Sequence, residues 1–227
     1  MEKAGKAMKS IFATGNEGKM RESREILKDM DAEILSMKEA GIEIDIEENG
    51  STFEENAEIK ARAVAAAVRM TAGENAAART AAGETPDDII VLADDSGLEI
   101  DYLDKAPGIY SARFAGEDTS YDVKNCILLD KLEGIPEEER TARFVCAVAA
   151  AFPDGSVETV RGTIEGSIAQ EMLGENGFGY DPIFYVPEYG CTTAQMDPDK
   201  KNELSHRGNA LRAMRKIIEA RFGKEEE

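Results

Sequence analysis

The chain is poor in basic residues, histidine, cysteine and long hydrophobic runs. Its 27 lysines and arginines stand against 46 aspartates and glutamates, which gives a net charge of −19. Stable docking along a nucleic-acid backbone needs a basic surface that displaces phosphate counterions, so we expect no nucleic-acid partner. A single phosphorylated small molecule remains compatible with this charge, provided that local cations offset the acidic field.

Cysteine usage indicates a reducing compartment. Cys126, Cys146 and Cys191 are odd in number and far apart, with no Cys-x-x-Cys pair, so neither a disulfide framework nor a zinc site is expected. No apolar run approaches the roughly 18 residues of a membrane span, and no signal-peptide core precedes the chain. We therefore expect a cytoplasmic protein without a membrane partner. His206 is the only histidine, and a lone histidine is more often structural than catalytic.

The most informative stretch is residues 89–97. The apolar run Ile89–Ala93 predicts a buried strand, which is followed by Asp94, Asp95, Ser96 and Gly97. Carboxylates at the mouth of a buried strand are costly unless they are compensated, and a divalent cation is the usual compensation. Gly97 predicts a turn into a second strand over residues 98–101. The alternative is an Asp-rich turn without a binding function.

A phosphate-binding turn is predicted near the start of the chain. Residues 10–14 have the pattern of a strand, residues 15–19 that of a Gly-containing turn, and a helical pattern follows. Free N–H groups and the dipole at a helix N-terminus attract an anion, and Lys19 adds a mobile positive charge. An ordinary strand-to-helix turn would have a similar sequence.

A second polar group opens the helix predicted from residue 52 to about Met70. Thr52-x-x-Glu55 is a capping box, so Glu55 has either a purely structural role or a place near a cation. Asn56 and Lys60 lie one helical turn apart, so three polar groups are able to converge there. Residues 71–88 lack large apolar side chains and are interpreted as a surface insertion, helical across residues 76–82.

The second half of the chain predicts a helix, a hairpin and two unusual loops. Asp118 or Thr119 is expected to cap a helix with an apolar inner face. Residues 142–150 form a predicted buried strand that pairs with residues 157–164 through the Asp154-Gly155 turn. The residues expected on the inner face of the helix are Val123, Cys126, Ile127 and Leu129.

The two loops have features of a ligand site. Two glycines bracket Phe178 within residues 176–184, a pattern that suits a backbone and ring close to a flat ligand, although a tight turn with packed aromatics would look similar. Ser205 is the expected N-cap of the last helix. His206 and Arg207 then fall in its first turn, where cations oppose the helix dipole and need another reason to be present.

Taken together, these segments resemble the inosine/xanthosine triphosphate pyrophosphatase family, which hydrolyses non-canonical purine nucleotides. Six motifs occur in the family's order and span nearly the whole chain, which makes the resemblance specific. They are Ala13-Thr14-Gly15-Asn16-x-Gly-Lys19, Thr52-Phe53-x-Glu55-Asn56-Ala57, Ala93-Asp94-Asp95-Ser96-Gly97-Leu98, Pro107 to Arg113, Gly177 to Phe184, and Ser205-His206-Arg207. The insertion at about 71–88 departs from the family pattern.

The resemblance implies an α/β fold with a long central mixed sheet, flanked by helices in two lobes with the active cleft between them. It implies a single catalytic domain over residues 1–227, a homodimer, and Mg2+ as cofactor. The implied reaction hydrolyses ITP, dITP and XTP to the nucleoside monophosphate and pyrophosphate.

The resemblance also implies roles for individual positions. Glu55 and Asp95 would bind the metal, and Asp95 would also accept the proton of the attacking water. The implied substrate-binding residues are Thr14, Gly15, Asn16, Glu17, Gly18, Lys19, Lys60, Ser96, Phe178, Gly179, Tyr180, Asp181, Lys201, His206 and Arg207. Two alternatives remain: a related pyrophosphatase acting on pyrimidine nucleotides, and a non-catalytic nucleotide-binding module.

Overall fold

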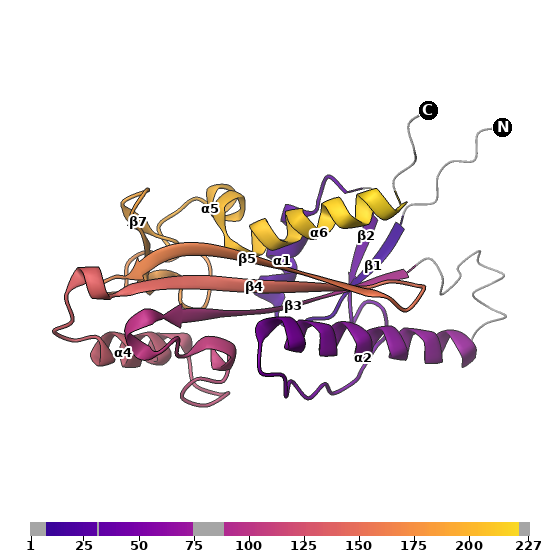
Figure 1. The fold of residues 1–227 in the computed structure, drawn as a ribbon, viewed down its shortest axis with the longest axis horizontal. Helices are drawn as coiled ribbons and strands as arrows, with labels where there is room; N and C mark the ends of the chain where they lie inside the picture. The colour runs from indigo at the N-terminus through magenta and orange to yellow at the C-terminus, as the bar shows by residue number, and fades with distance from the viewer. Residues whose placement is uncertain (1–7, 31, 75–88, 223–227) are drawn as a thin grey trace. The chain divides into compact units, whose positions relative to one another are not determined.

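The computed structural model describes residues 8–30, 32–74 and 89–222, and it contains a seven-stranded mixed sheet (Figure 1). The strands lie in the order β2-β1-β3-β4-β5-β6-β7. Strand β1 pairs in parallel with β2 and β3, whereas β6 is antiparallel to β5 and β7. The bounds are β1 Met8–Phe12, β2 Ala32–Ser36, β3 Ile89–Ile100, β4 Thr141–Ala151, β5 Val157–Ile168, β6 Phe184–Val186 and β7 Cys191–Thr192.

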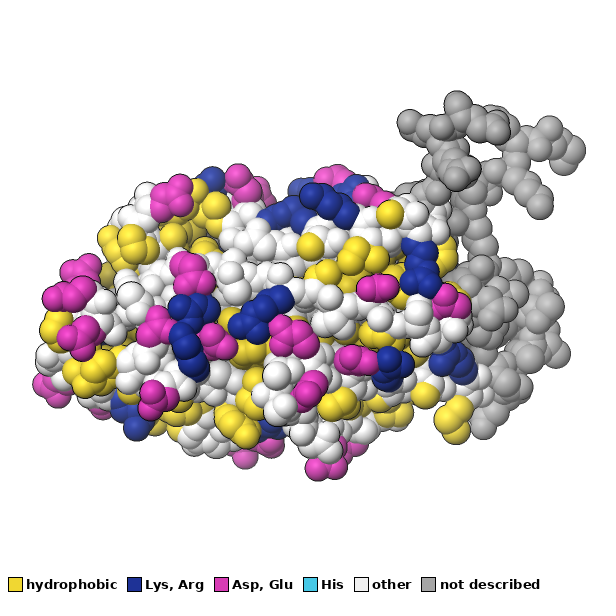
Figure 2. All heavy atoms as spheres, viewed as in Figure 1, with side chains coloured by type: hydrophobic (Ala, Val, Ile, Leu, Met, Phe, Trp, Pro, Cys, Tyr) yellow, Lys and Arg dark blue, Asp and Glu magenta, His cyan; other side chains and the backbone are white. Residues whose placement is uncertain are grey.

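Five α-helices accompany the sheet in the described residues, which confirms the expected mixed α/β fold. They are α1 Glu17–Ile26, α2 Phe53–Glu74, α4 Tyr121–Lys131, α5 Pro198–Leu204 and α6 His206–Phe222. Among the same residues, no helix combines the length and the apolar character needed to cross a bilayer. On the face shown in Figure 2, acidic and basic side chains are interspersed.

The contacts within the chain define two compact units. The first comprises Met1–Asp95, Ala147–Val160 and Leu211–Glu227, and the second comprises Ser96–Cys146 and Arg161–Ala210. Strand β3 passes from the first unit to the second at the bond that joins Asp95 and Ser96. The cleft between two lobes and the single catalytic domain expected from the resemblance both remain predictions.

In the first unit, the inner stripe of α2 explains why its alanine-rich sequence folds as a helix. Its buried residues recur every three or four positions, the spacing of one helical face. Small side chains on that stripe allow close packing without voids. The buried residues of this stripe are Ala57, Ala61, Val64, Ala65 and Val68.

In the second unit, a buried arginine ties a helix end to the sheet. Arg140 is 1% exposed, and its guanidinium donates to the carbonyl oxygens of Leu132, Ile168 and Ala169 at 2.6–2.9 Å. These bonds satisfy a charge that would be costly to bury alone. The loop after α4 is thereby fixed to the end of β5.

The turn predicted at Gly97 is wrong. Strand β3 continues for 12 residues from Ile89 to Ile100, and Asp94 and Asp95 lie in its middle as buried residues. Ion pairs with lysines stabilise both carboxylates, and Asn56 donates a hydrogen bond to Asp95. The strand therefore has no need to end where its charges begin.

The inner face predicted for the helix after residue 118 is wrong in part, although the predicted Leu129 does pack against the core. The N-cap is Ser120, whose hydroxyl accepts from the backbone N–H of Val123, and the buried residues of α4 are Lys124, Asn125 and Leu128. Lys124 donates to the carbonyl of Ala112, and Asn125 donates to the carbonyl of Gly179. Backbone carbonyls of two loops therefore draw Lys124 and Asn125 inward beside the core residue Leu128, and Val123 and Cys126 are exposed.

The β4–β5 hairpin is confirmed, and β5 extends four residues beyond the predicted Ile164. Backbone hydrogen bonds close it at the turn, from Phe152 N to Ser156 O, and at its far end, from Ile168 N to Arg140 O. Of the predicted insertion, residues 71–74 are the last turn of α2. The remainder, including the helix predicted over residues 76–82, lies outside the described residues.

Candidate functional site

In the first unit, the turn that connects β1 to α1 forms an accessible helix N-terminus. Asn16 is the N-cap of α1, because its side-chain oxygen accepts from the N–H of Lys19 at 3.0 Å. The hydroxyl of Thr14 accepts from the N–H of Asn16, which fixes the turn. Gly15, Asn16 and Glu17 are exposed. The first N–H groups of a helix have no acceptor within the helix, so this turn is able to bind an anion.

Lys19 links this turn to the centre of β3. Its ammonium lies 3.2 Å from a carboxylate oxygen of Asp94, a side chain with no exposed surface. An ion pair with one buried partner is screened little by solvent. Lys19, the lysine predicted to hold phosphate, is therefore held in place by Asp94 of β3.

Asp95, the next residue of β3, is contacted by two side chains of α2. The amide of Asn56 donates to Asp95 Oδ2 at 3.2 Å, and the ammonium of Lys60 lies 3.6 Å from Asp95 Oδ1. Asn56 is itself oriented by Gly50, whose N–H donates to Asn56 Oδ1 at 2.8 Å. Of the three polar groups predicted to converge, Asn56 and Lys60 do so at Asp95, whereas the contacts of Glu55 are with Ser51 and Thr52.

Glu48 is the last member of a cluster of three carboxylates and two ammonium groups, which we call the acidic cluster. Its residues are Glu48, Asp94, Asp95, Lys19 and Lys60. The carboxylate of Glu48 accepts from Lys60 at 2.9 Å. Burial opposes protonation of Lys60, but the charges of Asp95, Asp94 and Glu48 raise its pKa above the ordinary value. Three carboxylates therefore share two ammonium groups.

The electrostatics of Asp95 show that this compensation is incomplete. Burial raises the pKa of Asp95 above the ordinary aspartate value, although Lys60 and Lys19 act in the opposite direction. A carboxylate in an ideal ion pair would have a lowered pKa. Burial outweighs attraction here, so additional positive charge near Asp95 would be favourable.

Glu55, the other predicted metal ligand, is in a different state. It is exposed, and its carboxylate accepts from the N–H and hydroxyl of Ser51 at 2.6 and 2.7 Å, which lowers its pKa. Thr52 caps the helix as predicted, since its hydroxyl accepts from the N–H of Glu55. The carboxylate, however, bonds Ser51 and not the N–H of the capping residue.

The residues present suit Mg2+. No group of three or more acids, histidines or cysteines in residues 8–30, 32–74 and 89–222 is arranged to hold a metal by itself. Mg2+ does not require one, because it is commonly held by one or two carboxylates together with water and substrate phosphates. Asp95 offers oxygen donors, and its raised pKa is the mark of a site that favours a cation.

In the second unit, Asp181 is the centre of another polar group. It is 3% exposed, and its carboxylate accepts from the Phe178 N–H, the Lys201 ammonium and the Thr193 hydroxyl at 2.7, 2.7 and 2.8 Å. Gly177 has a φ of +77°, and a methyl group added there would lie 2.2 Å from Asp181 Oδ2. This loop therefore needs glycine because it packs against its own aspartate.

The Phe178 ring lies near two cations. Lys201 Nζ is 5.1 Å and Arg207 Cζ is 5.6 Å from its centroid, within the range of cation–π attraction. The Arg207 guanidinium also donates to the hydroxyl of Ser96 at 3.2 Å. Three separate motifs supply Ser96, Phe178 and Arg207, and the structure brings these residues together with Lys201 in one unit.

The side chains of His206 and Tyr180 are held by contacts inside the second unit. The imidazole of His206 is stacked on Phe144, with ring centroids 4.8 Å apart and an interplanar angle of 20°. The Tyr180 hydroxyl donates to the carbonyl of Ser111 at 2.7 Å, and burial together with Tyr121 raises its pKa. Tyr180 therefore has a structural role in this structure, since it ties the loop after Phe178 to the loop at Ser111.

Sequence reasoning missed two residues of the acidic cluster and one of the second group. Glu48 lies in a run of acidic residues, where composition cannot distinguish it from its neighbours. Asp94 was seen only as a companion of Asp95, and Thr193 gives no local signal at all. The one available hint was the adjacency of Asp94 and Asp95, because two buried carboxylates need separate partners.

Comparison with known proteins places this geometry in a family. The model of the Ham1 family matches residues 10–217. A dITP/XTP pyrophosphatase of Desulforamulus reducens is 46% identical over 211 residues, 93% of this chain and 96% of that protein. The dITP/XTP pyrophosphatase of Bacillus subtilis is 45% identical over 211 residues, 93% of this chain and 97% of that protein.

Solved structures agree. A HAM1 protein from Coxiella burnetii has a TM-score of 0.76 and 37% sequence identity, and the match covers 94% of this chain and 99% of that chain. The Staphylococcus aureus Ham1 protein has a TM-score of 0.75 and 38% identity with the same coverage. On the extent of these matches, the chain belongs to the Ham1 family.

Proposed function

We propose that this protein hydrolyses the non-canonical purine nucleotides ITP, dITP and XTP to the nucleoside monophosphate and pyrophosphate. The observation that carries the proposal is the composition of β3. Asp95 belongs to the acidic cluster, and the next residue, Ser96, accepts a hydrogen bond from Arg207. Consecutive residues of β3 therefore belong to two groups of side chains. The group of Asp95 suits phosphates and a cation, and the group of Ser96 suits a purine. Relatives at 45–46% identity bear the name dITP/XTP pyrophosphatase.

The residues of the first unit suit the chemistry at phosphorus. Attack by water on a phosphoanhydride needs positioning and charge neutralisation more than covalent help. The N-terminus of α1 offers N–H groups to phosphate oxygens, and Lys19 and Lys60 supply positive charge. The carboxylate of Asp95, which Asn56 orients, accepts the proton of the attacking water.

We propose Mg2+ as the cofactor, held by Asp95 with Glu55 as the second carboxylate. When bound, it would neutralise charge on the phosphate oxygens. Glu55 would then have to exchange its bonds with Ser51 for the cation. Asn56 holds one oxygen of Asp95 and leaves the carboxylate oriented for this role.

The residues of the second unit suit a 6-oxopurine. Phe178 stacks on the base, and stacking does not discriminate between purines. Arg207 donates to the O6 and N7 acceptors, as arginine does when proteins read guanine. Lys201 and His206 complete the surroundings of the base, with Asp181 holding Lys201.

The experiment is a product assay with a panel of nucleotides. Purified protein with Mg2+ is given ITP, dITP, XTP, ATP and pyrimidine triphosphates including methylated forms, and pyrophosphate and monophosphate are quantified. The proposal expects pyrophosphate from ITP, dITP and XTP in preference to ATP. Preference for a pyrimidine nucleotide would indicate the related pyrophosphatase, and binding without turnover would indicate a non-catalytic module.

We also propose that the protein acts as a homodimer in the cytoplasm. The dimer is proposed from family resemblance, and the compartment from the unpaired cysteines. Sedimentation velocity at micromolar concentration measures the oligomeric state. A species with the mass of a single 24.7 kDa chain would contradict it.

A further inference from the structure

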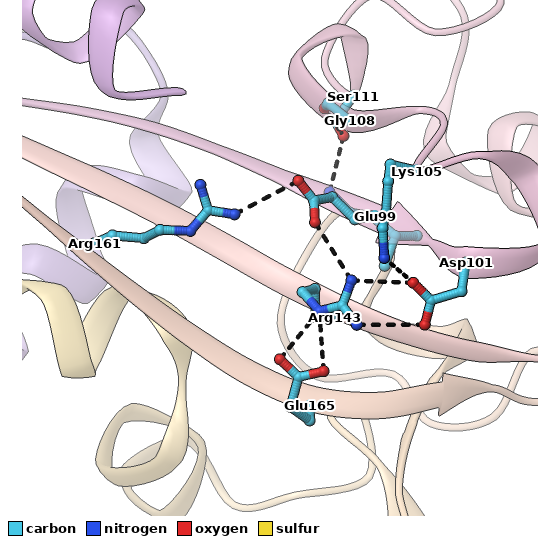
Figure 3. A network of polar contacts seen from close by, with 9 residues as sticks. Glu99, Asp101, Lys105, Gly108, Ser111, Arg143, Arg161 and Glu165 are labelled. Carbon is cyan, nitrogen blue, oxygen red and sulfur yellow. Dashed lines mark hydrogen bonds and ion pairs between the residues drawn. The ribbon is translucent and has the colours of Figure 1, made fainter. Parts of the chain in front are cut away.

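Strands β4 and β5 carry different chemistry on their two faces. Because successive side chains of a strand point to opposite faces, Arg143 and Phe144 on β4 are separated, as are Arg161 and Gly162 on β5. Figure 3 shows the charged face, where Arg143 reaches Glu165. The other face carries Phe144 and Gly162, and it contacts the beginning of α6.

The first turn of α6 is seated on that second face. Phe144 stacks on the His206 ring, as described above, and also lies against Phe184 with centroids 4.4 Å apart. The side-chain amide of Asn209 donates to the carbonyl of Thr163 on β5 at 3.0 Å. The helix start is thus attached to the sheet through a ring stack and a hydrogen bond.

Gly162 sets how closely the helix approaches. A methyl group added at Gly162 would lie 2.3 Å from the carbonyl oxygen of His206 and 2.5 Å from the backbone N of Ala210. These distances are roughly 1 Å shorter than ordinary non-bonded separations. Both neighbours are backbone atoms, so no side-chain rotation relieves the clash.

The sheet is the stiffer of the two partners. On its charged face, Arg143 of β4 contacts Glu165 of β5 and Glu99 of β3, and Arg161 of β5 contacts the same Glu99 (Figure 3). These ion pairs supplement the hydrogen-bond ladders of three neighbouring strands. A side chain at position 162 would therefore displace the first turn of α6 before it displaced β5.

We propose that Gly162 and Phe144 are positioning residues for substrate recognition. They act through His206 and Arg207, because Gly162 sets the depth of the first turn and Phe144 sets the orientation of the imidazole. The inference rests on the proposed function, in which His206 and Arg207 surround the purine. A displacement of about 1 Å at a recognition group costs up to ~100-fold in catalytic efficiency, so the absence of a side chain at Gly162 is itself a functional feature.

The first test does not involve substrate. His206 is the only histidine, so in untagged protein its imidazole gives the only histidine side-chain signals in a 1H–13C NMR spectrum. Gly162→Ala and Phe144→Leu are compared with Gly155→Ala as the matched control. Gly155 has a positive φ of +88°, which Gly162 does not have, and a methyl group added at Gly155 would meet no atom within 4 Å. The control therefore introduces backbone strain without a clash at α6.

We expect the His206 signal to move in Gly162→Ala, to move downfield in Phe144→Leu as the ring current is lost, and to stay in place in Gly155→Ala. We expect the ITP-to-ATP ratio of kcat/KM to fall ~10- to ~100-fold in Gly162→Ala, and to be unchanged in Gly155→Ala. A stationary His206 signal or an unchanged ratio in folded Gly162→Ala would overturn the proposal.

Two further outcomes separate this proposal from the proposed function. If Gly162→Ala does not fold, Phe144→Leu decides by the same two measurements, and an unchanged ITP-to-ATP ratio in that variant overturns the inference. If the wild-type protein shows no preference for ITP over ATP, the proposed function fails. The NMR comparison of Gly162→Ala with Gly155→Ala then still decides whether Gly162 positions the first turn of α6.

Discussion

Replacement of Arg207 by alanine should reduce discrimination between purines more than it reduces activity as a whole. Arg207 is 2% exposed and lies in the first turn of α6, where a cation opposes the helix dipole. Its guanidinium is held by the hydroxyl of Ser96 at 3.2 Å and lies 5.6 Å from the Phe178 ring centroid. A 6-oxopurine offers it two acceptors, whereas adenine places an amino donor at the same position.

The expected magnitude follows from this contact. A good bidentate contact between arginine and a 6-oxopurine contributes about 1–3 kcal/mol of discrimination, which is roughly 5- to 150-fold in a ratio of kcat/KM. Arg207→Ala should lower that ratio for ITP over ATP by this factor. Ser96→Ala, which removes only the hydroxyl that holds Arg207, should lower it less. Phe178→Leu removes the aromatic face and should weaken ITP and ATP to a similar degree.

The assay is pyrophosphate release at substrate concentrations below KM, with each variant first shown to be folded by thermal unfolding. ITP, XTP and ATP are measured in parallel, so any general loss of activity cancels in the ratio. If Arg207→Ala keeps the wild-type ITP-to-ATP ratio while kcat/KM falls for all substrates, Arg207 does not read the base and its role is structural.

Three further predictions concern stability and the insertion. The pKa of Asp101 is lowered by Lys105, Thr141 and Arg143, so its stabilising contribution is present above about pH 4 and is lost as pH falls below that value. The free energies of unfolding of Asp101→Asn and wild type should therefore converge at low pH. A difference that stays constant with pH would contradict this. Arg140→Met should lower the free energy of unfolding by about 2–4 kcal/mol in urea titrations, because three carbonyls lose a charged donor, whereas Arg143→Met on the half-exposed network should cost about 1 kcal/mol or less. Replacing residues 76–86, which include no large apolar side chain, with a short Gly/Ser linker should leave kcat/KM for ITP unchanged, and loss of activity in a folded variant would give that segment a role in catalysis.

Local sequence patterns correctly predicted the elements that are determined by neighbouring residues in the chain. The apolar run of β4, the cap Thr52 of α2 and the N-cap Ser205 of α6 were all predicted, because local hydrogen bonding or burial determines each of them. The β3 turn was predicted wrongly for the opposite reason. Charges in the middle of a buried strand are tolerated only when partners arrive from elsewhere in the chain, and local sequence does not contain that information.

The candidate site shows the same division. Asp95, Arg207 and Phe178 were identified because their motifs match those of a known family, whose site residues come from distant parts of the chain. Glu48 was missed, since nothing local distinguishes it, and only the structure shows its carboxylate at 2.9 Å from Lys60. The inward face of α4 was assigned to apolar residues, but Asn125 faces inward because a loop carbonyl needs its donor.

The Asp95→Asn variant separates the stability of the acidic cluster from its function. Burial raises the pKa of Asp95 in the folded protein, so at neutral pH the ionised carboxylate lowers stability relative to the neutral form, and this penalty disappears as pH falls below the unfolded value of about 3.9. The amide keeps the shape and removes the charge. Asp95→Asn should therefore be no less stable than wild type in EDTA at pH 7, while its turnover falls at least ~100-fold.

Adding Mg2+ should then raise the Tm of the wild-type protein only. A ligand that binds the folded state at 100 times its Kd stabilises that state by about 2.7 kcal/mol, a shift that thermal unfolding measures easily. Glu55→Gln provides the comparison. If Glu55 leaves Ser51 to bind the cation, this variant should also lose the Mg2+-dependent rise, since an amide is a poor ligand for a hard cation. An equal rise in Tm for Asp95→Asn and wild type would show that Mg2+ binds elsewhere and that the acidic cluster does not hold the metal.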